Sequence, residues 1–351
     1  MKTASDVDKA LQVKPTVSKE GTEFYNVNEP PFRIYGVFYE NGLFRRMPEE
    51  IARNTNEGVY ALHANTSGGR VRFRTDSPFV TVYAQMNGIC KMPHFALSGS
   101  AGFDMYIRQN GKERFYGSFI PAYDIENGFE SKLDFSTAEL KEITVNFPLY
   151  SNVSCLHIGI REGAQLLPPS DYRTEKPVVY YGSSITQGGC ASRPGNAYPS
   201  MISRRFDTDF INLGFSGSGK AEQVIADYVA SLEMSVFVYD YDHNAPDCNH
   251  LKNTHQRMFE TVRKKNPDLP IIMLTSTTME RFFDDRDKRK SIIRATYENA
   301  LANEDRNVYF IDANSLFEGD ADGATVEGCH PNDLGFKYLA DAIGEVLQKL
   351  I

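Results

Sequence analysis

The alternation of hydrophobic and polar residues divides the chain into two parts, and the pattern changes near residue 170. Before that point, short runs such as "GRVRFRT", "PFVTVYAQM" and "LKEITVNFPLY" alternate apolar or aromatic side chains with polar ones, which is typical of half-buried strands. Asn110-Gly111 lies between two such runs and predicts a tight hairpin. We expect residues 1–170 to form an all-β sandwich or jelly roll, with no helices between its strands.

After the linker "AQLLPPSDYRTEKP", strands and helices alternate. The apolar strands are "VVYYG", "DFINLG", "SVFVYD", "PIIMLTS" and "VYFIDA". Between them, segments such as "AEQVIADYVASLE" and "KSIIRATYENALANE" carry apolar residues at helical spacing. Residues 175–351 are therefore expected to form an α/β domain, in which a parallel sheet is flanked by helices. An active site in such a domain lies at the C-terminal ends of the strands.

Composition narrows the class of function. Of the 351 residues, 41% are hydrophobic and 24% are charged, as in a soluble globular protein. Lys and Arg number 38 against 46 Asp and Glu, a net charge of −8. The basic run 286–290 falls in a helical pattern, so we expect it to be a solvated face. An acidic chain without a basic stripe argues against nucleic acid as a partner and against a polyanionic substrate.

The chain offers no signal for a membrane or an export pathway. The N-terminal "MKTASDVDKALQVKPTV" lacks the apolar core of a secretory signal, and no run of 18 apolar residues occurs. Five scattered cysteines indicate free thiols rather than a disulfide framework. A cytoplasmic location is the resulting expectation, and the oligomeric state is left open.

Candidate chemistry follows the strand ends. Ser183 and Ser184 stand between glycines where the first strand meets a helix, which indicates either an exposed hydroxyl near backbone N–H groups or an ordinary Ser/Gly turn. Asn244 follows the third strand, and its amide can donate a hydrogen bond into the same crevice. His330 lies on the loop before the C-terminal helix, which Pro331 is expected to open, and Glu327 could orient its imidazole.

The stretch "INLGFSGSGKAEQV" has the spacing of a phosphate-binding loop, with Gly214 followed by Gly219-Lys220. Such a loop needs Ser or Thr after its Lys to bind Mg²⁺, and here Ala221 follows. The nucleotide interpretation also leaves the Asn and His at the neighbouring strand ends without a role. We therefore expect the loop to imitate a nucleotide site rather than to form one.

Four segments together resemble the SGNH (GDSL-type) hydrolase family. They are Gly182-Ser183-Ser184, then Asn212-Leu-Gly214-Phe-Ser216-Gly217, then Asp242-His243-Asn244-Ala245, and last Glu327-Gly-Cys-His330. The resemblance covers about residues 175–351 and implies a three-layer α/β/α, flavodoxin-like catalytic domain. "GFDMY", residues 102–106, is similar to a G-x-D-L-Y element that precedes such domains, which suggests that the sandwich is an integral partner of the hydrolase.

The resemblance implies the role of each site residue. Ser184 is the nucleophile, His330 the general base, and Glu327 the carboxylate that steadies the histidine. The backbone N–H groups of Ser184 and Gly217 and the side chain of Asn244 form the oxyanion hole, and no cofactor is needed. The third segment keeps the donor Asn244 but not its neighbours in the family pattern, and Ser183 and Glu327 each replace an aspartate. Asp322 or a backbone carbonyl is the alternative partner of the histidine.

Residues 242–250 contain a second cluster of side chains that can bind metal ions. Asp242, His243, Asp247, Cys248 and His250 are dense enough to suggest a metal site, but their spacing fits no zinc pattern, so no metal is expected. The resemblance implies a serine esterase for small acyl groups, most of all O-acetyl groups on carbohydrates or oligosaccharides. The alternatives are an acyltransferase, an esterase for other acyl esters, and an inactive carbohydrate-binding protein.

Overall fold

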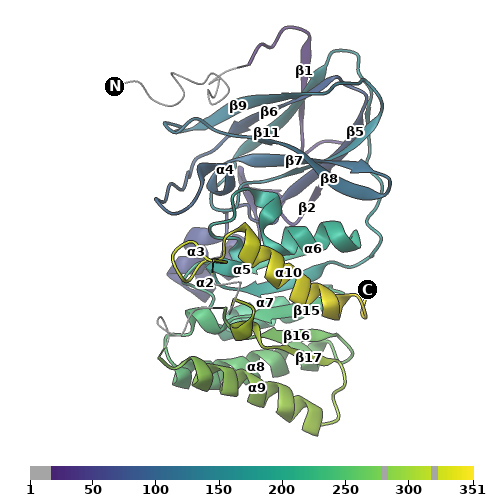
Figure 1. Ribbon diagram of the computed structural model, residues 1–351. Helices are drawn as coiled ribbons and strands as arrows, with labels where there is room; N and C mark the ends of the chain where they lie inside the picture. The colour runs from purple at the N-terminus through teal and green to yellow at the C-terminus, as the bar shows by residue number, and fades with distance from the viewer. Residues whose placement is uncertain (1–16, 278–283, 318–322) are drawn as a thin grey trace.

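The computed structural model describes residues 17–277, 284–317 and 323–351. Antiparallel sheets formed by the N-terminal part of the chain lie above a layered α/β region formed by the C-terminal part (Figure 1). This is the fold class that the sequence predicted. The exact domain limits, 1–170 and 175–351, stay a prediction.

Two antiparallel sheets enclose the core of the N-terminal part. The first sheet has the order β1 (Thr22–Asn26), β11 (Cys155–Arg161), β6 (Phe79–Gln85) and β9 (Gly128–Asp134). The second has the order β12 (Leu166–Leu167), β5 (Arg70–Thr75), β10 (Lys141–Asn146), β7 (Phe103–Gln109) and β8 (Lys112–Phe119), and β2 (Arg33–Tyr35) also pairs with β5. A short hairpin joins β3 (Phe38–Glu40) to β4 (Leu43–Arg45). Asn110 and Gly111 both have positive φ between β7 and β8, so the predicted tight hairpin is confirmed.

The second region is built on a five-stranded parallel sheet. Its order is β14 (Phe210–Gly214), β13 (Val178–Gly182), β15 (Val236–Asp240), β16 (Ile271–Leu274) and β17 (Val308–Ile311). The helices are α5 (Ser184–Gln187), α6 (Tyr198–Phe206), α7 (Gln223–Ser231), α8 (Cys248–Lys265), α9 (Arg286–Ala302) and α10 (Asp333–Leu347). The strand order places the first strand of the region inside the sheet, so the neighbouring crossovers run to opposite sides of it and leave a crevice at the strand ends.

Alternate residues of each parallel strand enter different cores, which makes three layers. Val179 and Tyr181 pack in the core beneath α7, α8 and α9, whereas Val178 and Tyr180 pack in the core beneath α6 and α10. Because both faces of the sheet are covered, its strands are apolar throughout rather than alternating.

The N-terminal part is not purely β, contrary to the sequence prediction. Residues 49–62 form two helices, α2 (Glu49–Thr55) and α3 (Glu57–Leu62), which Figure 1 shows beside the C-terminal region. Ala52 and Val59 are fully buried in the same core as α7. Asn56 caps α3 by accepting a hydrogen bond from the Val59 N–H at 2.8 Å. The sequence prediction missed these helices because residues 49–62 lie among strand-like segments, although the cap at Asn56 and the apolar spacing are present in the sequence.

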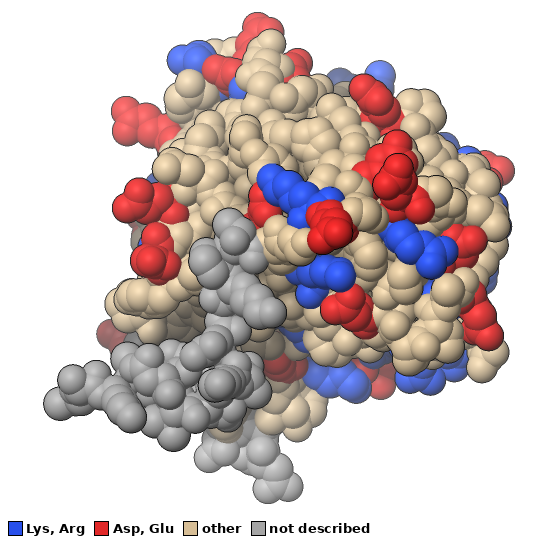
Figure 2. All heavy atoms as spheres, turned by 90° about the horizontal axis from the view of Figure 1, so that it is seen from above, with Lys and Arg blue, Asp and Glu red and all other residues tan. Residues whose placement is uncertain are grey.

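Two surface properties agree with the composition. On the face of the molecule seen in Figure 2, basic side chains lie among acidic ones, and the described atoms form no stripe of a single sign. None of the helices in the described residues is long and apolar enough to cross a membrane.

Candidate active site

The loops that follow β13, β14 and β15 bring the expected site segments together. β13 pairs in parallel with both β14 and β15, with Gly182 level with Gly214 on one side and Asp240 on the other. The nucleophile segment, the Gly217 loop and the Asn244 loop therefore leave the sheet at one edge. A short 3₁₀ helix, η3 (Asp242–Asn244), carries Asn244.

Ser184 opens helix α5 directly after β13. Ser183, which replaces the family aspartate, caps this helix by accepting a hydrogen bond from the Ile185 N–H at 3.1 Å. Tyr150 of the N-terminal part donates its hydroxyl hydrogen to the Ser184 carbonyl oxygen at 3.2 Å. The position of Ser184 is thus fixed by a helix cap and by a contact from the sandwich.

Ser184, His330 and Glu327 form a continuous chain of hydrogen bonds. His330 Nε2 lies 2.9 Å from Ser184 Oγ. The other ring nitrogen, Nδ1, is hydrogen-bonded to Glu327 Oε1, and the Glu327 carboxylate also accepts the His330 backbone N–H at 3.2 Å.

Helix α10 begins two residues later than expected, at Asp333, because Asn332 is its cap and accepts the Leu334 N–H at 3.0 Å.

The charge state of Glu327 suits a partner of an imidazole. Partial burial raises the pKa of its carboxyl, but the hydrogen bonds and the charge of His330 outweigh that effect, and the pKa lies below its ordinary value. Glu327 is therefore ionised at neutral pH. The alternative carboxylate, Asp322, lies outside the described residues.

The groups expected to form an oxyanion hole have N–H hydrogens that are available to a ligand. Among the described residues, the backbone N–H groups of Ser184 and Gly217 donate to no acceptor. Gly217 has φ +65°, a conformation that favours glycine. Asn244 donates one Nδ2 hydrogen to the Phe215 carbonyl oxygen at 2.8 Å, which leaves its second hydrogen for a ligand.

A buried arginine supports the Asn244 loop, which corrects one sequence expectation. The run 286–290 was expected to be a solvated face, but Arg289 is only 3% exposed. Its guanidinium donates to the carbonyl oxygens of Asp242 and Ala245, at 2.9 and 3.0 Å. A neighbouring helix, α9, thus supplies donors to the backbone of this loop.

The sequence also gave no indication of the role of Gln187, which is fully buried one helical turn after Ser184. Its Oε1 accepts the Ser216 N–H at 3.0 Å, and its Nε2 donates to Asn65 Oδ1 at 3.1 Å. Ser67 donates its hydroxyl hydrogen to the Gln187 carbonyl oxygen at 2.6 Å. Gln187 therefore joins the nucleophile helix, the loop that carries Gly217 and the sandwich.

The "GFDMY" segment contacts the catalytic region through its Asp and Tyr. Asp104 Oδ2 accepts the Gly195 N–H at 2.8 Å and pairs with Arg193 at 3.2 Å, while the Tyr106 hydroxyl is hydrogen-bonded to Arg193. A side chain at Gly195 would collide with the Tyr106 ring. The same loop donates the Ser192 N–H to Asp333, in the first turn of α10, at 2.9 Å. The segment thus supports a loop that lies between α5 and the His330 segment.

Members of the cluster at residues 242–250, considered above as a metal site, make separate structural contacts. Asp242 accepts the Ser276 N–H at 2.9 Å, and Asp247 caps α8 through the His250 N–H at 2.7 Å. Cys248 donates to Asp285 at 3.0 Å. Directly after the Gly214–Lys220 loop, the Ala221 N–H donates to the Tyr181 hydroxyl at 2.8 Å. That this loop binds no nucleotide stays a prediction.

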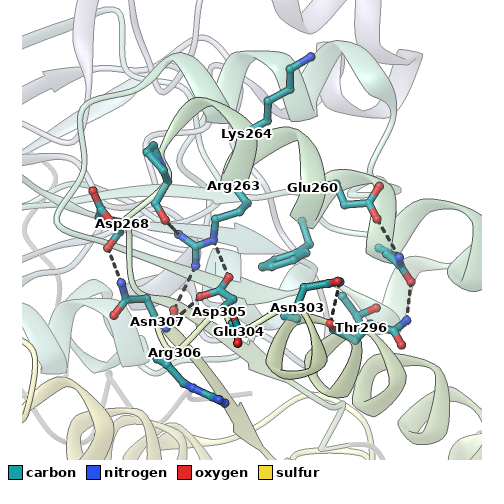
Figure 3. A pocket seen from close by; sticks show the side chains of 15 residues that line it. Glu260, Arg263, Lys264, Asp268, Thr296, Asn303, Glu304, Asp305, Arg306 and Asn307 are labelled. Atoms are coloured by element: carbon teal, nitrogen blue, oxygen red, sulfur yellow. Dashed lines mark hydrogen bonds and ion pairs between the residues drawn. The ribbon is translucent and has the colours of Figure 1, made fainter.

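A hollow of about 610 Å³ lies between α8 and α9, and none of the strand-end residues lines it. Arg263 and Asp305, two of its charged side chains, pair with each other (Figure 3). Arg263 pairs with Asp305 at 2.7 Å and donates to the Leu269 carbonyl oxygen at 2.6 Å. This arrangement ties α8 to the loops at the sheet edge.

Comparison with known families decides the classification. The sequence pattern of the GDSL-like lipase/acylhydrolase family matches residues 175–348, and the pattern described as the N-terminus of esterases of the SGNH hydrolase type matches residues 22–166. Residues 175–348 belong to the GDSL-like lipase/acylhydrolase family. The SGNH (GDSL-type) hydrolase resemblance of the four segments and of "GFDMY" is thereby confirmed, and the protein is an ester hydrolase of this type.

Solved structures share the whole two-part arrangement of this GDSL-like protein. A structure described as a GDSL-like lipase from Bacteroides ovatus ATCC 8483 is 28% identical, with a TM-score of 0.85 over 94% of this chain and 98% of that one. The salicylyl-acyltransferase SsfX3 of a tetracycline biosynthetic pathway is 19% identical, with a TM-score of 0.76 over the same shares. A family two carbohydrate esterase from Cellvibrio japonicus is 12% identical, with a TM-score of 0.62, again over 94% and 98%. No curated protein matches the chain significantly in sequence.

Proposed function

We propose that this protein is a serine esterase that removes small acyl groups, acetyl above all, from carbohydrates, with Ser184, His330 and Glu327 as its catalytic triad. The observation that carries the proposal is the 2.9 Å contact between Ser184 Oγ and His330 Nε2, completed by the bond from His330 Nδ1 to Glu327. A nucleophile, a base and an orienting carboxylate in hydrogen-bonded sequence are the parts that acyl transfer through a serine needs.

In this mechanism Ser184 Oγ attacks the ester carbonyl carbon while His330 Nε2 accepts the hydroxyl proton. The oxyanion that forms is bound by the N–H groups of Ser184 and Gly217 and by the Asn244 amide. His330 then protonates the leaving alcohol, and the acyl group remains on Ser184. A water molecule, deprotonated by His330, attacks this acyl-enzyme and releases the acid. Glu327 stabilises the imidazolium in both halves of the cycle.

The choice of a sugar ester rests on the surroundings of the site. His94, an exposed side chain of the sandwich, lies with its ring centre 5.8 Å from that of His330. The alcohol half of an ester bound at Ser184 therefore meets a polar group that can bind a hydroxyl. The fold that this chain shares is also that of family two carbohydrate esterases, among them one from Clostridium thermocellum solved with cellohexaose.

Acyl transfer to another alcohol is the second candidate, because the acyltransferase SsfX3 has the same two-part fold. It would use the same acyl-enzyme, and only the acceptor would differ. Adding simple alcohols or sugars to the assay separates the two functions: a hydrolase releases free acid at an unchanged rate, whereas a transferase forms a new ester.

The substrate experiment compares kcat/KM on acetyl, butyryl and octanoyl p-nitrophenyl esters and then measures acetate released from acetylated xylo- and cello-oligosaccharides. We expect the acetyl ester to be preferred and acetate to be released from at least one acetylated oligosaccharide. Preference for the octanoyl ester, with no acetate released from any sugar, would contradict the proposed substrate.

A further inference from the structure

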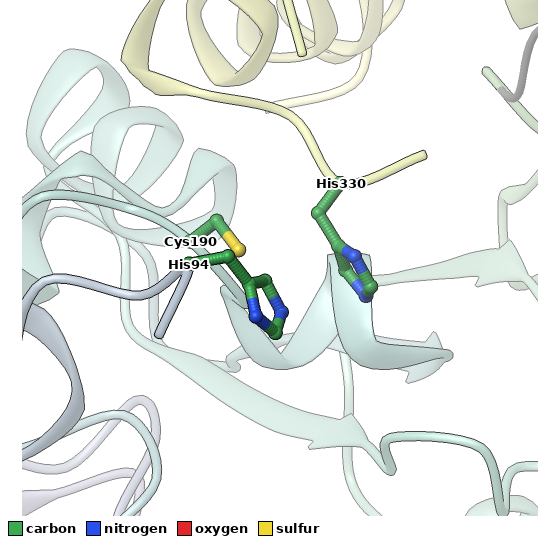
Figure 4. Close-up of side chains that lie close together, drawn as sticks. All are labelled: His94, Cys190 and His330. Carbon is green, nitrogen blue, oxygen red and sulfur yellow. The ribbon is translucent and has the colours of Figure 1, made fainter. Parts of the chain in front are cut away.

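Three side chains that commonly bind metal ions converge at the active site from separate segments of the chain. His94 comes from a loop of the sandwich, Cys190 from the loop after α5, and His330 from the loop before α10. A nitrogen of each histidine and the Cys190 sulfur all lie within 4.8 Å of one another. Figure 4 shows the thiol of Cys190 beside the His94 ring, with the His330 ring facing them.

The set matches the coordination chemistry of zinc. Structural and inhibitory zinc ions bind imidazole nitrogen at about 2.0–2.1 Å and thiolate sulfur at about 2.3 Å, so ligand atoms around one ion lie roughly 3–4 Å apart. Closing the present spacing requires a shift on the order of 1 Å. His94 is exposed, next to an isolated bridge between Met92 and Phe95, so its side chain can make that shift.

The hydrogen bond between His330 Nδ1 and Glu327, which orients the ring for catalysis, also orients it for binding a metal ion. Its Nδ1 is held by Glu327, so the lone pair of Nε2 points away from the carboxylate. Metal-binding histidines usually have such a carboxylate on their second nitrogen, because it fixes the ring and raises its basicity. An ion on Nε2 would replace the hydrogen bond to Ser184.

Cys190 is held in an unusual conformation beside these rings. Its φ of +73° is rare for a residue with a side chain, and the residue is buried, with 7% of its surface exposed. Burial and the nearby Glu327 charge raise the pKa of this thiol to about 12, so it is protonated until a cation binds. Coordination then breaks the S–H bond and releases the proton to solvent, and metal affinity should rise with pH.

We propose that His94, Cys190 and His330 form an inhibitory site for Zn²⁺ or a similar divalent transition metal ion, with water as the fourth ligand. The inhibition rests on the proposed role of His330 as the catalytic base, but the binding does not. A related group, Glu327, Cys329 and His330, also lies within 4.8 Å. Cys329 therefore provides the matched control, because it is an adjacent thiol outside the proposed ligand set.

The binding test uses Co²⁺, which reports thiolate coordination through a charge-transfer band in the near ultraviolet. The wild-type protein should show the band at one equivalent of Co²⁺, with release of one proton. Cys190→Ser should lose the band, His94→Ala should weaken binding by about tenfold or more, and Cys329→Ser should behave as wild type. No band in the wild type, or its loss in Cys329→Ser but not in Cys190→Ser, would overturn the site.

The activity test measures Zn²⁺ inhibition of p-nitrophenyl acetate hydrolysis, with each variant compared with its own metal-free rate. The inhibition constant should rise about tenfold or more in His94→Ala and Cys190→Ser. His157→Ala is a second control, because His157 Nδ1 lies 3.2 Å from the Cys155 sulfur in another imidazole–thiol pair. Full Co²⁺ binding without any inhibition would contradict the catalytic role of His330 and leave the metal site standing.

Discussion

Gln187 Oε1 accepts the backbone N–H of Ser216 at 3.0 Å, directly beside the glycine whose N–H is available to an oxyanion. The side chain comes from the helix that Ser184 opens, and its Nε2 donates to Asn65 of the sandwich. The buried Gln187 amide thus fixes the position of the Gly217 loop relative to Ser184. The N-terminal part of the chain positions this amide through Asn65.

Gln187→Met should lower kcat on acetyl esters by about ten- to a hundredfold with little change in KM, because a displaced oxyanion donor weakens the transition state rather than substrate binding. Exposed Gln223 gives the matched control, Gln223→Met. A Gln187→Met variant with unchanged kcat would show that the contact has no part in positioning.

Asp104→Ala should destabilise the protein by about 3–5 kcal/mol, because it removes the buried partner of Arg193 and of the Gly195 N–H. Urea unfolding gives the measurement. Asp134→Ala is the control, since Asp134 pairs with Lys132 at the surface and its side chain is 73% exposed. A loss for Asp104→Ala no larger than for the control would contradict a role of this segment in holding the two parts together.

The sequence predicted those features that depend on local pattern. The parallel strands, the Asn110-Gly111 hairpin and the placement of Ser184, Asn244 and His330 after strand ends all follow from residue spacing. The missed features depend on contacts between distant segments. Arg289 looks like any cation of a charged run, and only the fold shows that it faces the Asn244 loop.

The same limit applies to the N-terminal part. The cap at Asn56 was present in the sequence. The apolar residues of α2 and α3, however, are buried by the core of the C-terminal region, and that contact between distant segments cannot be predicted from local spacing. Likewise, His94 and Cys190 are separated by almost a hundred residues, and no spacing rule brings them to His330.

Asp242 should make the stability of the protein depend on pH. Burial raises the pKa of its carboxyl to about 7, well above its unfolded value. Between about pH 4 and about pH 7 the folded state therefore keeps a proton that the unfolded state releases, so stability falls as the pH rises through this window. Asp242→Asn, which keeps an oxygen for the Ser276 N–H, should flatten this fall in urea unfolding series, whereas exposed Asp227→Asn should not. An unchanged slope in Asp242→Asn would contradict the assignment.

Glu327→Ala should reduce kcat less than loss of the base itself, because the carboxylate orients and stabilises His330 without exchanging a proton with the substrate. Parallel kinetics of Glu327→Ala and Asp322→Ala on p-nitrophenyl acetate decide which carboxylate has this role. The hydrogen bond between Glu327 and His330 favours Glu327. If Asp322→Ala proved the more damaging change, the third member of the triad would be Asp322.

The central claim is that Ser184 and His330 perform the chemistry, and steady-state hydrolysis of p-nitrophenyl acetate tests it most directly. Ser184→Ala and His330→Ala should each lower kcat by a factor on the order of 10⁴ or more, with circular dichroism and melting temperature close to wild type. Ser231→Ala, at an exposed position in α7, should leave the rate unchanged. Activity near the wild-type level in either folded variant, Ser184→Ala or His330→Ala, would contradict the account.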